Sequence, residues 1–183
     1  GPSGCGKSTI LSILAGLINK TDGDIIIDDN TSIGYMLQTD SLFPWRTILD
    51  NCLIGLEVNG LKNEENISYV ISLLEKYGLG DFLDKYPDNL SGGMRQRVAL
   101  IRTLALKPDI LLLDEPMSAL DYQSRLSISD DIYKIIKNEK KTAIMVTHDI
   151  AEAVSMSDRV IVLTKRPGVI KSIYEIVLEN RST

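Results

Sequence analysis

The nine residues GPSGCGKST at positions 1–9 combine side chains and a spacing that suit a chain of phosphates. Glycines at the first, fourth and sixth positions permit backbone conformations in which successive N–H groups turn toward phosphate oxygens. Lys7 supplies a positive charge for the outer phosphates, and the Ser8 hydroxyl suits a Mg²⁺ ion. The segment therefore predicts a nucleotide-binding loop. The alternative is a glycine-rich turn that matches the pattern by chance.

The stretch DILLLDEP places two carboxylates, Asp114 and Glu115, at the end of an apolar run. Such a run predicts a strand buried in a parallel sheet, and the carboxyl edge of an open α/β sheet is where ligands bind. One carboxylate can hold Mg²⁺, while the next can orient and deprotonate an attacking water. Alone, the pattern is more typical of a solvated strand end. Beside a phosphate loop, it predicts nucleotide hydrolysis.

A third segment, LSGGMRQR, precedes a helical pattern that Pro108 closes. Ser91, Gly92 and Gly93 would then form a helix N-terminus with one hydroxyl and free N–H groups, which predicts a second anion site. The alternative is an ordinary serine N-cap beside a glycine-rich turn.

The elements that must position these residues alternate between strand and helix. Short apolar runs predict strands at 24–28, 32–37, 110–113, 142–147 and 159–164. A buried helix is predicted directly after the phosphate loop, from a stripe of apolar residues: Ile10, Ile13, Leu14, Leu17 and Ile18. Further helical patterns are centred on residues 67–74 and 128–136, and the stretch from Gln38 to Leu90 contains only helical segments and loops. The pattern predicts an α/β core with a helical insert.

Composition narrows the range of partners. The 183 residues include 25 acidic and 20 basic side chains, a balance that gives no electrostatic basis for binding nucleic acid. Cys5 and Cys52 lie far apart and lack the spacing of a metal or redox pair. No apolar run approaches the roughly 18 residues of a membrane span. Any membrane involvement would therefore depend on a partner.

In this order, the phosphate loop, LSGGMRQR and DILLLDEP resemble the ATP-binding-cassette ATPases, whose signature motif separates them from other P-loop proteins. The resemblance covers nearly the whole chain. It implies a P-loop NTPase core with a mostly parallel sheet, at 1–37 and 97–183, and an inserted helical subdomain at 38–96 that ends in the signature motif. Met94 departs from the commonest signature, which has glutamine there; activity is expected to survive because the preceding serine and glycines carry the phosphate contacts.

The resemblance implies a role for each motif residue. Gln38, which ends the strand SIGYMLQ, matches the Q-loop glutamine, and His148 matches the switch histidine that contacts the γ-phosphate. A lone histidine at a strand end is usually structural, and only its place after the other motifs favours a functional role. The implied catalytic residues are Glu115, His148 and Gln38. The implied Mg²⁺ ligands are Ser8, Gln38 and Asp114. The implied ATP-binding residues are Gly1, Pro2, Ser3, Gly4, Cys5, Gly6, Lys7, Ser8 and Thr9, with Ser91, Gly92 and Gly93 supplied by a second subunit. The residues SALD, which would touch that subunit, are Ser118, Ala119, Leu120 and Asp121.

The segment SLFPWRTILDN follows the Q-loop, where family members meet their membrane subunits. The candidate permease contacts are Phe43, Pro44, Trp45 and Arg46. The alternative is that they pack inside the helical insert. The sequences LFPWRT and LSGGMRQR are most similar to those of importers of nitrate, sulfonates, taurine and related small solutes. The implied partners are a second ATPase subunit, transmembrane permease subunits and, indirectly, a solute-binding protein, at the cytoplasmic face of the membrane.

Two other readings remain open at this point. One is a soluble cassette ATPase that acts in DNA repair or translation, and the other is an inactive fragment. Family members carry a strand before the phosphate loop and an aromatic residue that stacks on adenine. The sequence is therefore expected to be partial, and the chain as given is expected to fold poorly or to bind ATP weakly.

Overall fold

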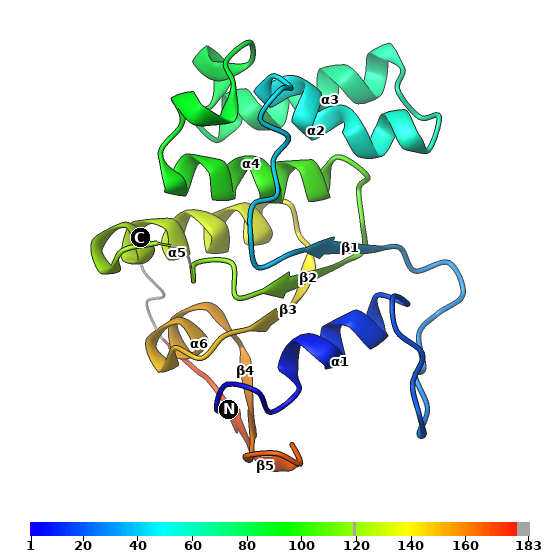
Figure 1. The fold of residues 1–183 in the computed structure, drawn as a ribbon, viewed down its shortest axis with the longest axis vertical. Coiled ribbons are helices and arrows are strands. Elements are labelled where there is room, and N and C mark those ends of the chain that lie inside the picture. The colour runs from blue at the N-terminus through cyan, green and yellow to red at the C-terminus, as the bar shows by residue number, and fades with distance from the viewer. Residues whose placement is uncertain (119, 179–183) are drawn as a thin grey trace.

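A short parallel sheet lies at the centre of the fold, in a computed structural model that describes residues 1–118 and 120–178 (Figure 1). Its strands are β1 (Ile33–Met36), β2 (Ile110–Asp114) and β3 (Thr142–Val146), in that spatial order and all parallel. Ile110 pairs with Ile33 on one side and with Thr142 on the other. The residues that follow the three strands therefore lie at one edge of the sheet. This arrangement confirms the predicted α/β class.

The central strand, β2, is covered on both faces. Leu111, Leu112 and Leu113 are at most 1% exposed. Helix α1 (Lys7–Leu14) contacts β2 and β3 from one side of the sheet, and α4 (Gly92–Leu104) contacts β1 from the other (Figure 1). A strand buried in this way has no polar face, which explains the unbroken apolar run in its sequence.

A layer of helices lies beyond α4. Helices α2 (Ile48–Val58) and α3 (Glu64–Lys76) pack against each other and against α4, and two short 3₁₀ helices, Gly80–Phe82 and Pro87–Asn89, lead from α3 to α4. Residues 38–90 are all described, and this stretch contains helices and loops only, as predicted. Apolar side chains of the three helices join those of β2 in one core.

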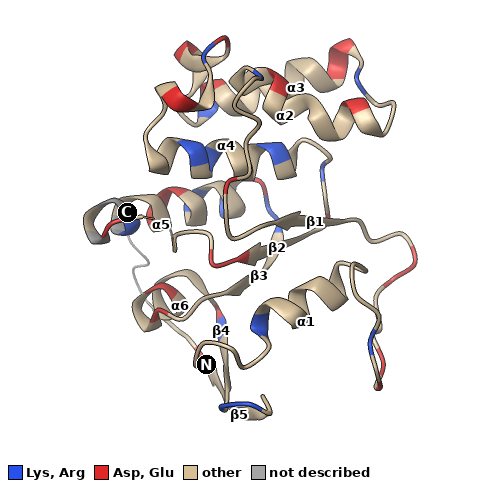
Figure 2. Cartoon of the chain, viewed as in Figure 1, with Lys and Arg blue, Asp and Glu red and all other residues tan. Residues whose placement is uncertain are grey.

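Helix α4 carries basic residues (Figure 2), and two of them hold the chain that leaves β1. Arg95 Nε lies 3.1 Å from Asp40 Oδ2, and Arg102 donates hydrogen bonds to the carbonyl oxygens of Asp40 and Ser41 at 2.5 and 2.8 Å. Burial lowers the pKa of Arg102, and the two carbonyls compensate for part of the lost hydration. These contacts hold the segment that carries Gln38.

The last third of the chain adds two helices and a hairpin. Helix α5 (Tyr122–Asn138) connects β2 to β3, and α6 (Ile150–Met156) follows β3. The strand predicted at 159–164 is present as β4 (Arg159–Leu163). It pairs antiparallel with β5 (Ile170–Glu175), which the sequence analysis did not predict. These two strands form a separate sheet.

The strand predicted at 24–28 is wrong. These five residues have no regular secondary structure, and Ile26 is 95% exposed. A strand requires a hydrogen-bonded neighbour, and none of the described strands pairs with this segment. The run of isoleucines indicated strand propensity, but propensity alone does not supply a partner.

The predicted apolar stripe of the first helix is also wrong in part. Helix α1 ends at Leu14, because Gly16 adopts a left-handed conformation with φ of 72° just beyond it. Leu17 and Ile18 therefore lie outside the helix and are at least 50% exposed. The buried residue of α1 is Leu11. It is adjacent in sequence to Ile10 and was not part of the predicted stripe.

Within the described part of the chain, the helices are too short or too polar to span a lipid bilayer.

Candidate nucleotide site at the carboxyl edge of the sheet

The glycines of the phosphate loop adopt the conformations that their sequence positions predict. Gly4 and Gly6 have φ values of 74° and 100°, a region that residues with a Cβ rarely occupy. Gly6 is the N-cap of α1, so the free N–H groups of the first helical turn face the loop. Lys7 Nζ donates hydrogen bonds to the carbonyl oxygens of Gly1 and Pro2, both at 3.0 Å.

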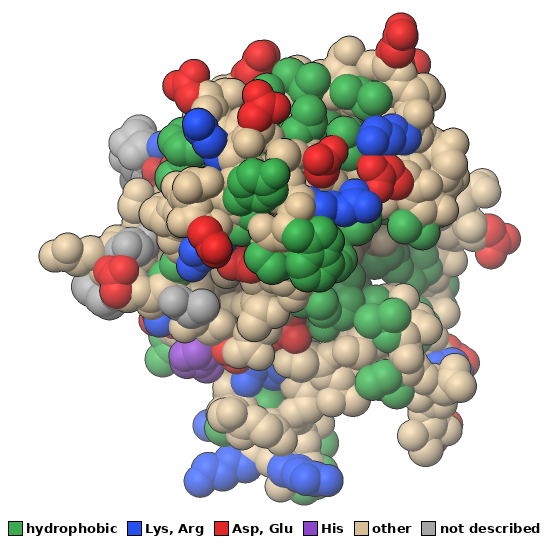
Figure 3. All heavy atoms as spheres, turned by 45° about the horizontal axis from the view of Figure 1, so that its top comes forward, with side chains coloured by type: hydrophobic (Ala, Val, Ile, Leu, Met, Phe, Trp, Pro, Cys, Tyr) green, Lys and Arg blue, Asp and Glu red, His purple; other side chains and the backbone are tan. Residues whose placement is uncertain are grey.

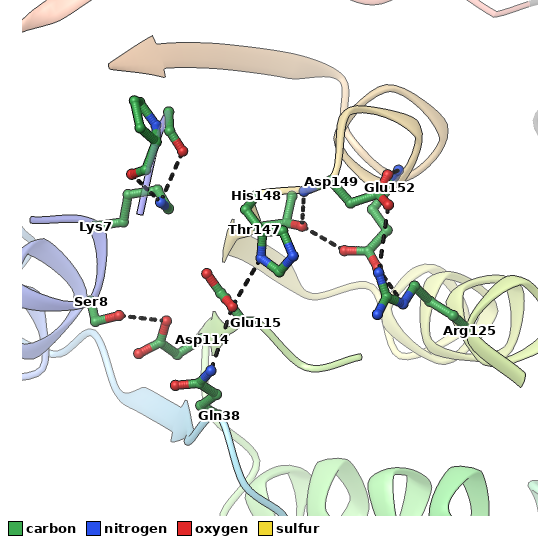
Figure 4. A network of polar contacts seen from close by, with 12 residues as sticks. Lys7, Ser8, Gln38, Asp114, Glu115, Arg125, Thr147, His148, Asp149 and Glu152 are labelled. Atoms are coloured by element: carbon green, nitrogen blue, oxygen red, sulfur yellow. Dashed lines mark hydrogen bonds and ion pairs between the residues drawn. The ribbon is translucent and has the colours of Figure 1, made fainter. Parts of the chain in front are cut away.

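A polar contact joins the phosphate loop to the end of β2. Ser8 Oγ donates to Asp114 Oδ1 at 2.9 Å (Figure 4), and Tyr35 OH donates to Asp114 Oδ2 at 3.3 Å. Burial raises the pKa of Tyr35, and the charge of Asp114 raises it further, so the phenol stays a donor at neutral pH. A hydroxyl and a carboxylate beside a phosphate loop form a donor set that fits Mg²⁺.

Glu115 lies between residues from the two neighbouring strands. Its Oε2 is 3.1 Å from His148 Nδ1 and 3.5 Å from Gln38 Nε2 (Figure 4). The Glu115 backbone has a φ of 44°, and its N–H donates to the Val146 carbonyl at 2.9 Å. A left-handed conformation is uncommon for glutamate. It is held here by the hydrogen bond to β3 and directs the carboxylate along the sheet edge.

The second predicted anion site lies elsewhere in the chain. Ser91 is the N-cap of α4, and its Oγ accepts a hydrogen bond from the N–H of Met94 at 3.3 Å. A Cβ on Gly93 would lie 2.5 Å from Ile128 Cδ1, so a larger residue at this position would displace the Ile128 side chain of α5. A hollow of about 480 Å³ is lined by Ser91, Gly92, Gly93, Arg97, Leu120, Asp121, Ser127, Ile128 and Asp131. Because α4 and α1 lie on opposite sides of the sheet (Figure 1), the fold does not bring this group to the phosphate loop of the same chain.

Two of the SALD residues adjoin that hollow. Leu120 and Asp121 line it, and Leu120 Cδ2 would lie 2.9 Å from a Cβ on Gly92. The Ser118 N–H donates to the Glu115 carbonyl at 3.0 Å, which turns the chain away from the sheet. Ala119 lies outside the described residues.

The candidate permease contacts form an exposed turn before α2. Trp45 is 71% exposed, and its ring centroid lies 5.3 Å from that of Phe43. Pro44 is also exposed, and Arg46 Nη1 forms an ion pair with Glu57 Oε2 at 2.7 Å. Apolar side chains gather on the face of the molecule that includes the helical layer (Figure 3).

Asn51 holds this turn in place, and the sequence analysis did not select it. Its side chain is fully buried, accepts from the Phe43 N–H at 2.7 Å, and donates to the carbonyls of Phe43, Arg46 and Thr47. An asparagine in an otherwise apolar helical stretch was the one available signal, since a buried amide needs several hydrogen-bond partners.

Similarity to known proteins shows the family of this chain. A family model described as ABC transporter matches residues 1–118. The uncharacterized ABC transporter ATP-binding protein YtlC of Bacillus subtilis is 49% identical over 185 residues, which cover 98% of this chain and 71% of the relative. The taurine import ATP-binding protein TauB of Ruegeria pomeroyi is 41% identical over 182 residues, which cover 96% of this chain and 68% of the relative.

A solved structure agrees with the fold as well. The dimeric post-hydrolysis state of the ATP-binding cassette MJ0796, bound to ADP and Pi, has a TM-score of 0.76 and 32% identity. The match covers 97% of this chain and 83% of the other. Since the family model spans well over half of the chain and the two relatives align along almost all of it, the chain belongs to the ABC transporter family and is an ATP-binding, ATP-hydrolysing subunit of a transporter.

Proposed function

We propose that this subunit works at the cytoplasmic face of the membrane as a pair of identical chains, and that it powers the import of a small solute through a separate permease. The observation that carries the catalytic part of the proposal is the meeting of three strand ends. Gln38 follows β1, Asp114 ends β2 with Glu115 directly after it, and His148 follows β3. Glu115 contacts Gln38 and His148, and Asp114 contacts Ser8 of the phosphate loop.

Each side chain has a role that its contacts support. The loop N–H groups and Lys7 bind the phosphates of ATP, and Lys7 exchanges its two carbonyl contacts for phosphate oxygens. Ser8 and Asp114 would hold Mg²⁺, with Gln38 nearby. When bound, Mg²⁺ neutralises charge on the outer phosphates. Glu115 would accept the proton of the attacking water, and His148, which lies beside Glu115, would contact the γ-phosphate.

The proposed domain division accounts for how a structural change on nucleotide binding is transmitted to the permease. Residues 1–37 and 97–183 form the core, and residues 38–96 form the helical subdomain. Helix α4 crosses this boundary and is therefore shared by both parts. The segment after Gln38 is held by two arginines of α4, and it leads directly to the exposed turn with Phe43 and Trp45.

A second subunit would complete the site. The Ser91 group lies on the far side of the sheet from its own phosphate loop, and a paired chain can present it to the γ-phosphate of its partner. The dimeric MJ0796 cassette, at 32% identity, supports such a pairing. The residues Ser118, Ala119, Leu120 and Asp121 would then lie at the contact between the chains.

Substitution of Ser91 tests whether each ATP site is formed by residues of two chains. Ser91→Arg should leave ATP binding to one chain unchanged, because Ser91 does not contact its own phosphate loop, and it should abolish turnover. Mixing the Ser91→Arg and Lys7→Ala variants in equal amounts should restore part of the wild-type rate of phosphate release. In each mixed dimer, one ATP site combines the intact Lys7 of one chain with the intact Ser91 of the other.

The controls for the mixture are the two single variants alone and a mixture of Ser91→Arg with wild type. Activity in the mixture above that of either single variant supports a site shared between chains. Loss of ATP binding by Ser91→Arg alone would show instead that Ser91 serves its own nucleotide.

The import proposal is tested with permease-containing vesicles. TauB of Ruegeria pomeroyi, a taurine import protein, is 41% identical to this chain, so taurine is the first probe and nitrate the second. ATP-driven accumulation of either probe supports the assigned solute class. ATP hydrolysis stimulated by the permease without accumulation of either probe would exclude that class.

Trp45→Ala in the same vesicles tests the docking turn. The side chain is 71% exposed and absent from the apolar core, so the variant should hydrolyse ATP normally as a free subunit. Its transport rate should fall at least about 10-fold, as expected for an aromatic residue at an interface centre. Val58→Ala, which also removes exposed apolar surface but at the end of α2, is the matched control. Wild-type transport by Trp45→Ala would assign the permease contact to another surface.

A further inference from the structure

One buried carboxylate lies outside the predicted nucleotide site. Among the described residues, the buried carboxylates are Asp114, at the phosphate loop, and Glu152 in α6, which is 7% exposed. An ionised carboxylate is costly to bury unless charged and hydrogen-bonding partners surround it. The partners of Glu152 therefore indicate what it holds in place.

Glu152 closes a ring of hydrogen bonds around the backbone of His148. Thr147 Oγ1 donates to Glu152 Oε2 at 2.6 Å and accepts from the Asp149 N–H at 2.9 Å. Asp149 Oδ1 in turn accepts from the Glu152 N–H at 3.1 Å. The residues on both sides of His148 are thus fixed to the start of α6, and the imidazole between them is directed toward Glu115 (Figure 4).

Arg125 joins this ring to the loop after Glu115. From α5, its Nε lies 3.7 Å from Glu152 Oε1 and its Nη1 lies 3.6 Å from Asp149 Oδ2, which are ion-pair distances (Figure 4). Its Nη2 donates to the Leu120 carbonyl at 3.3 Å, in the loop predicted to touch the second subunit. The Arg125 side chain is 21% exposed, so water screens these contacts only in part.

We propose that Arg125 and Glu152 are positioning residues for hydrolysis, which hold His148 against Glu115 and tie its place to the loop at 116–121. The guanidinium fork suits this task because it reaches two carboxylates and a carbonyl at once, whereas lysine provides only a point charge. A displacement of that loop when two chains associate would then be transmitted to His148 through Arg125. The inference rests on the proposed roles of Glu115 and His148.

The variants that test it are Glu152→Gln, Arg125→Gln and Arg125→Lys in the full chain. We expect Arg125→Gln and Glu152→Gln to lower kcat for ATP hydrolysis by about 10–100-fold, the effect of displacing a reacting group by about 1 Å. KM for ATP should change less than about threefold, because neither side chain contacts the phosphate loop. Arg125→Lys should recover part of the lost rate. Lys134→Gln, which removes a cation paired with Asp130 on the same helix, is the matched control.

A second measurement separates positioning from loss of folding. His148 is the one histidine in the sequence, so imidazole ¹⁵N labelling gives a single set of signals. In Arg125→Gln and Glu152→Gln we expect these signals to shift and broaden while the chain still melts cooperatively. Unchanged signals and wild-type kcat in both variants would overturn the inference. So would a loss of rate accompanied by unchanged histidine signals.

His148→Ala distinguishes failure of this inference from failure of the proposed function. If His148→Ala is inactive and Arg125→Gln has wild-type kcat, the positioning inference alone is wrong. If His148→Ala has wild-type kcat, the proposed role of His148 is wrong, and the inference falls with it.

Discussion

Glu115→Gln is expected to bind ATP as tightly as the wild-type chain and to hydrolyse it about 10²–10⁴-fold more slowly, the usual contribution of a positioned general base. Glutamine has the shape of glutamate, and its amide oxygen can still pair with Gln38 Nε2 and His148 Nδ1, so the geometry at the strand ends should survive. What is lost is the negative charge and, with it, the ability to accept a proton from water.

Single-turnover phosphate release and ATP binding measure the two parts of this prediction. Asp109→Asn is the matched control, since it removes a carboxylate from just before the amino end of β2, where its contacts are with Ser32. A wild-type rate of hydrolysis in Glu115→Gln would remove this residue from the role of base. A large loss of ATP affinity would place it among the binding residues instead.

Lys7→Ala is expected to weaken Mg-ATP binding by at least about 100-fold. A charge-assisted hydrogen bond contributes about 1.5–3 kcal/mol, and the lysine is placed to reach more than one phosphate oxygen. In the structure, Lys7 Nζ donates to the carbonyls of Gly1 and Pro2. Its removal therefore also leaves two loop carbonyls without that partner.

Calorimetric titration with Mg-ATP measures the effect of Lys7→Ala. Lys20→Ala provides the control, because Lys20 is 46% exposed and pairs with Asp24 away from the loop. An affinity for Lys7→Ala within a few-fold of wild type would refute the assignment of the phosphate loop.

Features governed by nearby residues could be predicted from the sequence. The left-handed glycines of the phosphate loop and the serine cap of α4 depend on local backbone chemistry, and both appear as predicted. The strand ILLLD could be predicted because a strand buried on both faces has an unbroken apolar sequence. The strands of a parallel sheet all end at the same edge, so the predicted parallel sheet also placed Gln38, Glu115 and His148 at one edge.

Features that depend on distant partners could not be predicted. The isoleucines at 25–27 have strand propensity without a strand beside them, and β5 pairs with β4 across a turn whose Pro-Gly pair, at 167 and 168, the sequence analysis did not use. Arg125 and Glu152 are ordinary surface residue types by sequence. Their importance arises only from the packing of α5 against α6, which buries Glu152 beside the residues that flank His148.

The oligomeric state of Glu115→Gln with and without ATP tests the central claim most directly, because slow hydrolysis should trap two chains around two nucleotides. Sedimentation in the full chain should show monomers without nucleotide and dimers with Mg-ATP, at one nucleotide per chain. Adding Ser91→Arg to the same variant should keep it monomeric while ATP still binds. A Glu115→Gln chain that binds ATP and stays monomeric, or that dimerises equally well with Ser91→Arg, would contradict a site shared between two copies.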